Sequence, residues 1–247
     1  MKQISVLFAF LLIMVSCDPP EPQPEPLTPI EQKIKYLSRI LFSESTNVAA
    51  SCTWDSQNRL STYHTELQDL NDMTFHYDSL NRVSKIDCYY WEYGYGYYLL
   101  YWADEEKLDY ADFYINKKRP PFFDSTYRFE SKYTYTYDTR NRCTQIHREG
   151  GWNIKFHLEW ENNNITKLYE IFSGDTSFYI NSAYDNNPSI FSAFPKIPIM
   201  MFNGLAYNPS QNNTVRWYDY DEDGYPIRFY ISDGAGGRRL LNVYEYK

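Results

Sequence analysis

Histidines and paired carboxylates are the residues of this chain that could take part in acid–base catalysis or bind a metal ion. Their spacing predicts neither a catalytic site nor a metal site. The four histidines show no His-Glu-x-x-His or comparable ligand spacing, and they are His64, His76, His147 and His157. His76 and His157 fall at polar positions of alternating segments, where a solvated histidine is the ordinary role. The sequence has no Gly-x-Ser-x-Gly elbow and no glycine-rich phosphate loop. We therefore expect no enzyme, with no catalytic residue, no cofactor and no metal.

One acidic stretch has half of a calcium-binding pattern. Asp219, Asp221 and Asp223 alternate along the chain before Gly224, and carboxylates at alternate positions of an EF-hand loop converge on the cation. The glutamate that would close such a loop twelve positions in is replaced by Tyr230. The same residues suit the hairpin turn described below. We expect a turn here and keep calcium as the lesser alternative.

The densest chemical feature of the sequence is aromatic. Nine of the fourteen residues from Tyr89 to Trp102 are tyrosine or tryptophan, and Gly94 and Gly96 among them fit a turn. Successive side chains of a strand face opposite sides, so these rings cannot all belong to one core. Exposed rings would offer a stacking surface for a glycan or a protein partner; the alternative is burial by neighbouring strands. The candidate ligand-binding residues, at an exposed hairpin tip, are Trp91, Tyr93, Tyr95 and Tyr97.

An internal repeat predicts the elements that position these side chains. Its unit is an aromatic residue, an acidic residue, two or three polar residues, a basic residue and an apolar one, as in Trp54–Leu60, Tyr77–Val83 and Tyr137–Cys143. Looser copies begin at Trp102, Trp160, Tyr184 and Tyr220. The steps between starts are 23, 25, 35, 23, 24 and 36 residues. This doubled pattern, with an offset near 83 residues, indicates tandem duplication of a three-hairpin module.

Each unit is typical of a β-hairpin, because Asp, Asn and Gly tolerate the dihedrals of a tight turn. The alternation in Tyr133–Tyr137 and Ile154–Trp160 predicts the flanking strands. We expect an all-β antiparallel meander of about 14 strands across residues 28–247, in modules at about 43–125 and 126–220. One apolar face on so long a sheet must be hidden, which favours a closed or nearly closed barrel over a β-solenoid sheet or shell.

Two smaller expectations concern the connections. The long steps carry Pro120-Pro121 in one module and Pro195 and Pro198 in the other, which should mark extended loops. Residues 28–31 (Thr-Pro-Ile-Glu) have the form of a helix capping box, so a short helix could precede a strand around residues 36–42.

Three cysteines fall within the repeat region, and they are Cys52, Cys88 and Cys143. Three cannot all pair with one another, although disulfides form readily in exported proteins. Cys143 takes the place that Leu60 and Val83 take in other copies of the repeat. We favour small buried hydrophobes over a bridge and leave the pairing open.

The first residues have the pattern of an export signal. Lys2 supplies a positive charge, residues 4–15 are almost unbroken apolar sequence, and the run is too short to cross a bilayer as a mature helix. The run ends at Ser16-Cys17, which resembles the lipobox of bacterial lipoproteins, although Met14 replaces the usual leucine. We expect residues 1–16 to be a signal peptide and Cys17 to be lipidated. Residues 17–27, rich in proline and glutamate, should form an extended tether.

Lipobox, acidic proline-rich stalk and Tyr-Asp-x-x-Asn-Arg-Val units together resemble a Bacteroidota lipoprotein family of unknown function, described as having a porin-like fold. The resemblance covers nearly all of the mature chain and rests on YD-type repeats, which are turn motifs. It implies a barrel, and it transfers no activity and no catalytic residue. Acidic residues after Cys17 resemble the surface-export signals of such lipoproteins, which implies outer-membrane attachment and leaves open which side the domain faces.

Three classes of function follow. The first is a binding lipoprotein for a glycan or a protein, held to the membrane through the lipid on Cys17. The second is a structural or assembly component of the outer membrane, and the third is a membrane-inserted porin-like barrel. A mean hydropathy of −0.62 argues against the third class, because a lipid-facing barrel needs a continuous apolar belt. A formal charge of −8, with scattered lysine and arginine, argues against a nucleic-acid partner.

The lipid anchor is directly testable. We expect mass spectrometry of the mature amino terminus to find Cys17 as the first residue, carrying acyl chains, because the apolar run of residues 4–15 is followed directly by Ser16-Cys17. An unmodified Cys17, or a chain that keeps residues 1–16, would contradict the prediction.

Overall fold

The computed structural model describes residues 34–43, 46–66, 70–90, 94–116, 126–151, 153–181, 184–198, 212–214 and 217–247. The chain divides into two compact units, Met1–Gln32 and Lys33–Lys247, and all described residues belong to the second. The predicted signal peptide, Cys17, the tether and the capping box lie outside the described residues. Among the residues described, no helix is long and apolar enough to span a membrane.

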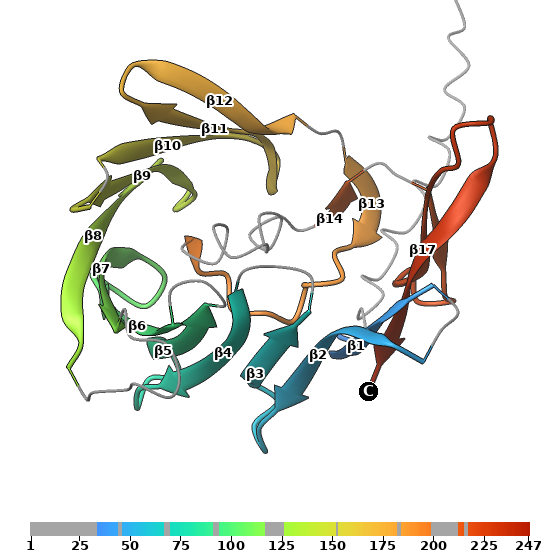
Figure 1. The fold of residues 1–247 in the computed structure, drawn as a ribbon, viewed down its shortest axis with the longest axis horizontal. Helices are drawn as coiled ribbons and strands as arrows, with labels where there is room; N and C mark the ends of the chain where they lie inside the picture. The colour runs from blue at the N-terminus through green and yellow to red at the C-terminus, as the bar shows by residue number, and fades with distance from the viewer. Residues whose placement is uncertain are drawn as a thin grey trace, which may run out of the picture. The chain divides into compact units, whose positions relative to one another are not determined.

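Fifteen strands form one antiparallel sheet that largely follows the order of the chain (Figure 1). The strands are β1 (Leu37–Phe42), β2 (Val48–Trp54), β3 (Leu60–Thr65), β4 (Leu70–Tyr77), β5 (Val83–Tyr90), β6 (Gly94–Trp102), β7 (Leu108–Asn116), β8 (Arg128–Tyr137), β9 (Cys143–Glu149), β10 (Ile154–Glu161), β11 (Asn164–Phe172), β12 (Asp175–Asn181), β15 (Trp217–Tyr220), β16 (Pro226–Ser232) and β17 (Arg238–Tyr246). Two further strands, β13 (Tyr184–Pro188) and β14 (Asn212–Thr214), pair with each other. The prediction of an antiparallel all-β meander is confirmed, with one strand more in the main sheet than the expected number.

The sheet is nearly closed. Strand β1 pairs with β17, so the first and last described strands are neighbours, with Ile40 opposite Tyr244. The described ladder ends at β12 on one side and at β15 on the other. Strand β13 is linked to both sides by side chains, because the Tyr184 hydroxyl donates to the Ile165 carbonyl of β11 and the Tyr220 hydroxyl of β15 donates to the Asp185 carboxylate.

One face of the sheet carries the core, as the alternating pattern requires. Along β5, for example, the side chains of Val83, Ile86 and Cys88 are buried. The chain after β13 packs on this inner face, where the Phe194 ring contacts the rings of Trp54 and Tyr63 at 5.7 and 6.0 Å between centroids. Figure 1 shows this segment inside the curve of the sheet. The loop after β13 therefore covers part of the inner face.

The segment after β13 also carries two of the prolines that predicted extended loops. Pro195 and Pro198 lie in a loop that is rich in turns, where an extended loop was predicted, and Pro120-Pro121 lies outside the described residues. The three cysteines of the repeat region are free, with Cys88 and Cys143 buried and Cys52 half-buried against the core. Their apolar surroundings agree with the interpretation as small hydrophobes.

The repeat motif is a closed hydrogen-bonded turn. In the copy at Asp78, its carboxylate accepts from the backbone N–H groups of Leu80 and Arg82 at 2.9 and 3.0 Å, and Arg82 Nε donates to the other oxygen at 2.9 Å. Asn81 sits at φ 63°, a left-handed conformation that asparagine tolerates better than most residues. The copies at Asp55 and Asp138 repeat these bonds. The spacing of Asp, Asn and Arg is thus set by one turn geometry.

The aromatic side chain of six of the seven units, Tyr184 included, donates a hydrogen bond to a backbone carbonyl earlier in the chain, whereas Tyr220 donates to the Asp185 carboxylate. The Tyr77 hydroxyl donates to the Leu60 carbonyl at 2.8 Å, across 17 residues of sequence. We call this bond the aromatic lock. Equivalent locks run from Trp54 to Leu37, Trp102 to Val83, Tyr137 to Leu108, Trp160 to Cys143 and Tyr246 to Pro226. Each lock satisfies a carbonyl at the first residue of a strand or close to it, so the turns along one end of the sheet are held in a fixed order.

Arginine strengthens the same junction. The Arg59 guanidinium lies 4.3 Å from the Tyr77 ring centroid, and its Nη1 donates to Asn81 of the next turn at 2.8 Å. Arg142 makes the matching bond to the Asn162 carbonyl and lies 5.9 Å from the Trp160 ring. The Tyr77–Leu60 and Trp160–Cys143 locks match at an offset of 83 residues, whereas the Trp54–Leu37 and Tyr137–Leu108 locks do not match at that offset, so the duplication stays a prediction. The boundaries of the two modules stay a prediction.

Removing one lock should destabilise the whole sheet measurably. We expect Tyr77→Phe to lower the free energy of unfolding by about 1 kcal/mol, because the ring and its cation–π contact remain while the Leu60 carbonyl loses its donor. Urea titration measures the change. The matched control is Tyr101→Phe on the exposed outer face, which should stay within about 0.5 kcal/mol of wild type. Equal stability of both variants would contradict a structural role for the lock.

The turns also predict an acid sensitivity. The backbone N–H of Arg59 lowers the pKa of Asp55, and that of Arg82 lowers the pKa of Asp78, so each carboxylate is more acidic folded than unfolded. Such groups stabilise the fold above the unfolded pKa near 3.9, and the contribution disappears as pH falls through the folded value. Between pH 5 and pH 2, Asp55→Asn/Asp78→Asn should therefore lose less stability than wild type in urea titrations. Parallel losses would overturn this assignment.

Candidate functional site

The predicted aromatic segment forms most of the β5–β6 hairpin, but its turn is not where the glycines indicated. Gly94 and Gly96 are both in β6, and Gly94 pairs with Tyr90, the last residue of β5. Trp91 and Tyr93, two of the candidate ligand-binding residues, lie outside the described residues. The reason for Gly96 is packing. A Cβ there would lie 2.8 Å from the Phe113 ring and 2.9 Å from the Tyr114 carbonyl oxygen. Glycine lets a neighbouring aromatic ring lie against the backbone.

The described rings of the segment divide between the two faces. Tyr90 and Tyr98 face inward, where their hydroxyls are 2.8 Å apart, and Tyr98 stacks on Phe113 at 4.5 Å. Burial raises the pKa of both phenols well above the ordinary value. Tyr95 and Tyr97 face the other side of the sheet, with Tyr95 43% exposed. Part of the run is therefore core, and part forms an outer surface.

Rings from neighbouring strands extend that surface across β5 to β8. Tyr97 stacks on Tyr114 at 4.9 Å and 16°, and Tyr101 stacks on Tyr110 at 4.3 Å and 17°. The ring of Phe129, 53% exposed, meets the edge of the Tyr114 stack at 5.8 Å. We call the set the outer aromatic surface, and it comprises Tyr89, Tyr95, Tyr97, Tyr101, Tyr110, Tyr114, Tyr127 and Phe129.

Charged groups are interleaved with these rings. The Lys132 ammonium lies 3.9 Å from the Tyr110 ring centroid, and the Lys85 ammonium lies 5.0 Å from that of Tyr97. Lys85 also pairs with Asp87 at 2.7 Å. Desolvation raises the pKa of Tyr97, so its hydroxyl is a neutral donor at physiological pH. The surface thus combines ring faces with hydrogen-bond donors and acceptors.

Sequence analysis missed four members of this surface, Tyr110, Tyr114, Tyr127 and Phe129. The alternation of Tyr110 and Tyr114 around Asp112 was a signal that they share the outer face. Their proximity to Tyr97 and Tyr101 depends on the β6–β7 register, which pairs Tyr97 with Tyr114 and Tyr101 with Tyr110.

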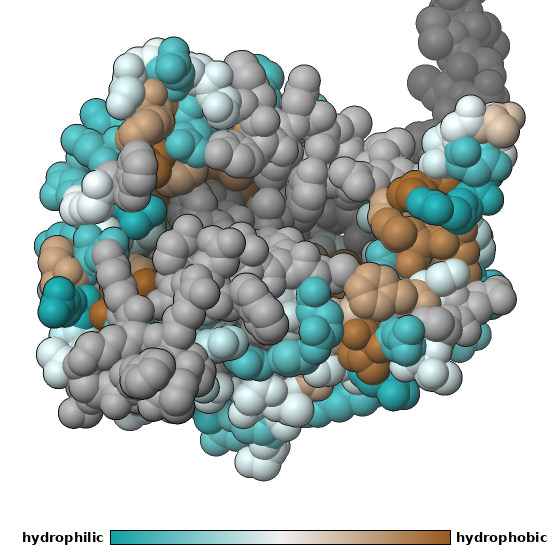
Figure 2. Space-filling view, in the orientation of Figure 1, coloured by the Kyte–Doolittle hydropathy of each residue, from teal (hydrophilic) through white to brown (hydrophobic). Residues whose placement is uncertain are grey.

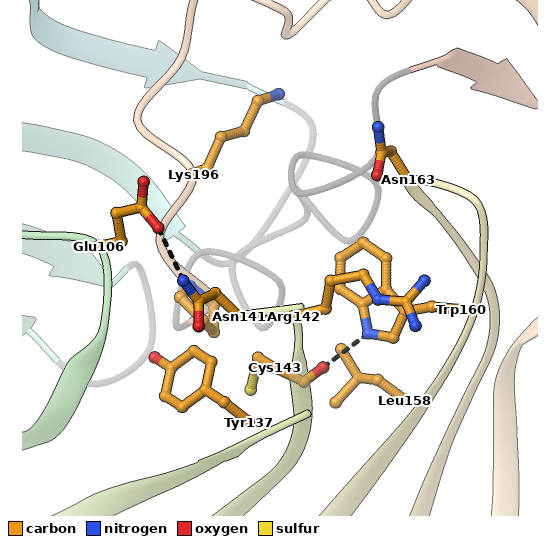
Figure 3. A pocket seen from close by; sticks show the side chains of 10 residues that line it. Glu106, Tyr137, Asn141, Arg142, Cys143, Leu158, Trp160, Asn163 and Lys196 are labelled. Atoms are coloured by element: carbon orange, nitrogen blue, oxygen red, sulfur yellow. Dashed lines mark hydrogen bonds between the residues drawn. The ribbon is translucent and has the colours of Figure 1, made fainter. Parts of the chain in front are cut away.

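A second candidate site lies on the inner face, at the turn end of β8 to β10. It is a pocket of about 270 Å³ (Figure 3). Its floor includes buried Cys143 and Leu158, and the half-buried rings of Tyr137 and Trp160 also line it. Figure 3 shows Cys143 between these two rings, with Lys196 across the space from Tyr137.

Polar groups from four chain segments complete the pocket. Asn141 Nδ2 donates to Glu106 Oε2 at 2.9 Å, which joins two neighbouring turns at the rim, and Asn163 and Arg142 line it as well. Lys196 comes from the loop after β13, and its Nζ donates to the Phe191 carbonyl at 3.1 Å. The Lys196 side chain is exposed to solvent. Sequence analysis gave no sign of this pocket, because Lys196 is distant in sequence from the other lining residues.

The acidic stretch is a turn whose carboxylates hold a lysine. Lys35 Nζ lies 2.8 Å from Asp221 and 2.6 Å from Asp223. Asp221 also accepts from the backbone N–H groups of Asp223 and Tyr225. In the described part of the chain, no group of three or more His, Cys, Asp or Glu side chains could hold a metal ion.

The histidines occupy polar positions of the sheet. His64 lies 2.6 Å from Asp72, and this hydrogen bond raises the pKa of the imidazole. His76 lies 2.6 Å from Asp87, His147 contacts Asn153, and His157 stacks on Tyr169. These are surface hydrogen bonds and stacking contacts of ordinary strands.

No family model and no curated protein sequence matches the chain. Among solved structures, the chain is similar to a porin-like protein from Bacteroides uniformis. The two share 15% sequence identity, with a TM-score of 0.48, over 85% of this chain and 96% of the other.

Proposed function

We propose that the protein is a non-catalytic outer-membrane lipoprotein that binds a glycan through the outer aromatic surface. The observation that carries the proposal is the exposure of this surface. Tyr95, Tyr101, Tyr127 and Phe129 are 43, 38, 40 and 53% exposed, and they belong to three groups of contacting rings on the outer side of β5 to β8. A large exposed patch of apolar rings on a protein surface usually marks a binding site.

The rest of the outer face is polar, unlike the outer aromatic surface. Its strands present paired charges, such as Lys167 with Glu159 at 2.7 Å. Figure 2 shows hydrophilic residues along much of the visible margin of the curved sheet. The core lies on the opposite face, so polar residues at the outer positions of β6 and β7 would leave the core intact. The fold therefore does not require aromatic residues at these positions.

A glycan fits this surface better than a protein. From Tyr95 to Tyr101 the strand extends about 20 Å, which is long enough for several sugar units in a row. Protein interfaces are depleted of charge at their centre, whereas Lys85, Asp87 and Lys132 lie among these rings. Sugars need both ring faces and polar groups that bond hydroxyls, and the surface offers the two side by side.

The proposed location of the protein rests on its amino-terminal sequence. The apolar run to Ser16, the candidate lipidated Cys17 and the proline-rich stalk support membrane attachment through a lipid, with the folded unit held beyond a tether. The YD-type turns and the stalk support membership of the Bacteroidota lipoprotein family that the chain resembles. We include this membership and the outer-membrane location in the proposal.

The outer face argues against the alternative of a membrane-inserted porin-like barrel. Such a barrel faces lipid with an apolar belt and holds polar groups inside. Here the inner face is apolar and the outer face carries charges. On β10, for example, Lys155 and Glu159 are exposed. A structural or assembly role is the remaining alternative, and the binding experiment below distinguishes it.

Glycan binding is tested with the mature, detergent-solubilised chain on a glycan array, followed by calorimetric titration of any hit. We expect Tyr95→Ala/Tyr101→Ala/Phe129→Ala to weaken the hit at least tenfold, because ring contacts contribute roughly 0.5–1.5 kcal/mol each. The matched control is Trp217→Ala, which removes an exposed ring (42%) on the distant edge strand β15 and should leave binding unchanged.

Circular dichroism of each variant checks that the sheet is intact. An array without hits, or a hit that survives the triple substitution, would contradict the proposal. Capture of an envelope protein that is lost in the triple variant, with no glycan hit, would favour the assembly role instead.

A further inference from the structure

We infer that the inner pocket is a second binding site, for one neutral sugar ring. The pocket lies on the opposite face of the sheet from the outer aromatic surface and shares no residue with it. The inference therefore goes beyond the proposed function and stands on different observations.

The pocket has the size of a single small ligand. Its volume of about 270 Å³ lies just below the range of about 300–1,000 Å³ that is typical of drug-sized ligands. One pyranose ring fits such a space, and a longer glycan does not. Glu106, Asn141 and Asn163 are exposed at the rim, so a ligand can enter from the turn end of the sheet.

The space depends on the small side chain of Cys143. This residue is the closing apolar residue of its turn unit, and Leu60 and Val83 hold the same place in two other units. All three side chains are buried. Cys143 lies between two rings of the pocket lining (Figure 3). A thiol is smaller than either alkyl side chain, so a leucine at position 143 would take up part of the pocket.

The floor of the pocket is apolar because the aromatic locks engage its polar atoms. The Tyr137 hydroxyl donates to the Leu108 carbonyl and accepts from the Leu108 N–H, both at 3.0 Å. Trp160 Nε1 donates to the Cys143 carbonyl at 2.7 Å. These two side chains therefore offer ring carbons to a ligand, and Leu158 adds its alkyl group. Such a floor suits the C–H groups of a sugar ring.

The rim offers two hydrogen-bond acceptors on neighbouring side chains. Glu106 Oε2 accepts from Asn141 Nδ2 at 2.9 Å, which holds the two side chains together. Among the residues that the structure describes, neither Glu106 Oε1 nor Asn141 Oδ1 has a hydrogen-bond partner. Sugar hydroxyls can donate to both oxygens, whereas a ligand carboxylate would bring further acceptors next to the charged Glu106.

The basic side chains of the lining do not reverse this preference. Each nitrogen of the Arg142 guanidinium already has a partner, because Nε and Nη2 lie 2.8 and 2.7 Å from Asp138 and Nη1 lies 2.7 Å from the Asn162 carbonyl. Lys196 donates to the Phe191 carbonyl, and its side chain is exposed, where solvent and salt weaken the attraction to an anion. A neutral ring that carries hydroxyl groups therefore matches the floor and the rim together.

The test is an NMR titration with methyl glucoside and methyl galactoside, and with glucuronate and galacturonate as their acidic partners. The parent protein is the mature chain carrying Tyr95→Ala/Tyr101→Ala/Phe129→Ala, so the outer aromatic surface does not contribute. We expect a neutral hexoside to bind with a Kd on the order of 1 mM, and its acidic partner to bind about tenfold more weakly. Because the parent lacks the outer rings, failure of the outer site and failure of this pocket are separate results.

Two substitutions place the bound sugar in the pocket. Cys143→Leu should weaken hexoside binding about tenfold, because the larger side chain occupies the floor. The fold should tolerate this change, since another turn unit has Leu60 at the same place. Glu106→Gln should weaken binding about threefold, because it replaces a charged acceptor at the exposed rim with a neutral amide.

Matched controls change the same kinds of position outside the pocket. Val83→Leu enlarges the closing residue of the unit at Tyr77, and Glu159→Gln neutralises an outer-face carboxylate that pairs with Lys167. Both variants should bind the hexoside like the parent. Thermal unfolding verifies that every variant is folded.

Three results would overturn the inference. The first is no hexoside binding up to about 20 mM, and the second is equal or tighter binding of the acidic sugars. The third is unchanged hexoside binding in a folded Cys143→Leu variant, or in Glu106→Gln if Cys143→Leu does not fold.

Discussion

The structure depends on one hydrogen bond repeated along the turn end of the sheet, in which the aromatic side chain of a unit donates to a backbone carbonyl earlier in the chain; the unit at Tyr220 alone donates to a carboxylate instead. A meander has only nearest-neighbour strand contacts, and each hairpin alone is marginal. The aromatic lock joins successive hairpins through side chains, as in Tyr77 to Leu60 and Trp160 to Cys143. Arginine above the ring and the Asp-x-x-Asn turn beneath it hold both partners in place.

The aromatic residues that stabilise the fold lie on the inner face of the sheet, and the remaining ones lie on the outer face. The inner rings, such as Trp54 and Tyr77, form locks and core contacts. The rings of the outer aromatic surface contact mainly each other, at a face that the fold does not need to cover. The inner pocket also depends on the locks. The Tyr137 and Trp160 locks fix two rings of its lining, and the loop that carries Lys196 lines the pocket from another part of the chain.

Local features were predictable from sequence, and long-range ones were not. The Asp, Asn and Arg of each turn act within five residues, so their spacing predicted the hairpins, and the alternation of β8 and β10 predicted the strands. The partner of each lock is a carbonyl, which has no sequence signature. Gly96 looked like a turn residue because the ring of Phe113 that requires it is on another strand. Lys196 reaches the pocket from a loop about fifty residues after Cys143, a placement that only the path of the chain determines.

The most direct test of the account is hydroxyl-radical footprinting of the mature chain with and without a bound oligosaccharide, read residue by residue by mass spectrometry. If the outer aromatic surface is the binding site, oxidation of Tyr95, Tyr101 and Phe129 should fall when the glycan is present, while exposed Trp217 keeps its reactivity. Unchanged oxidation of these three rings at saturating glycan would contradict the account.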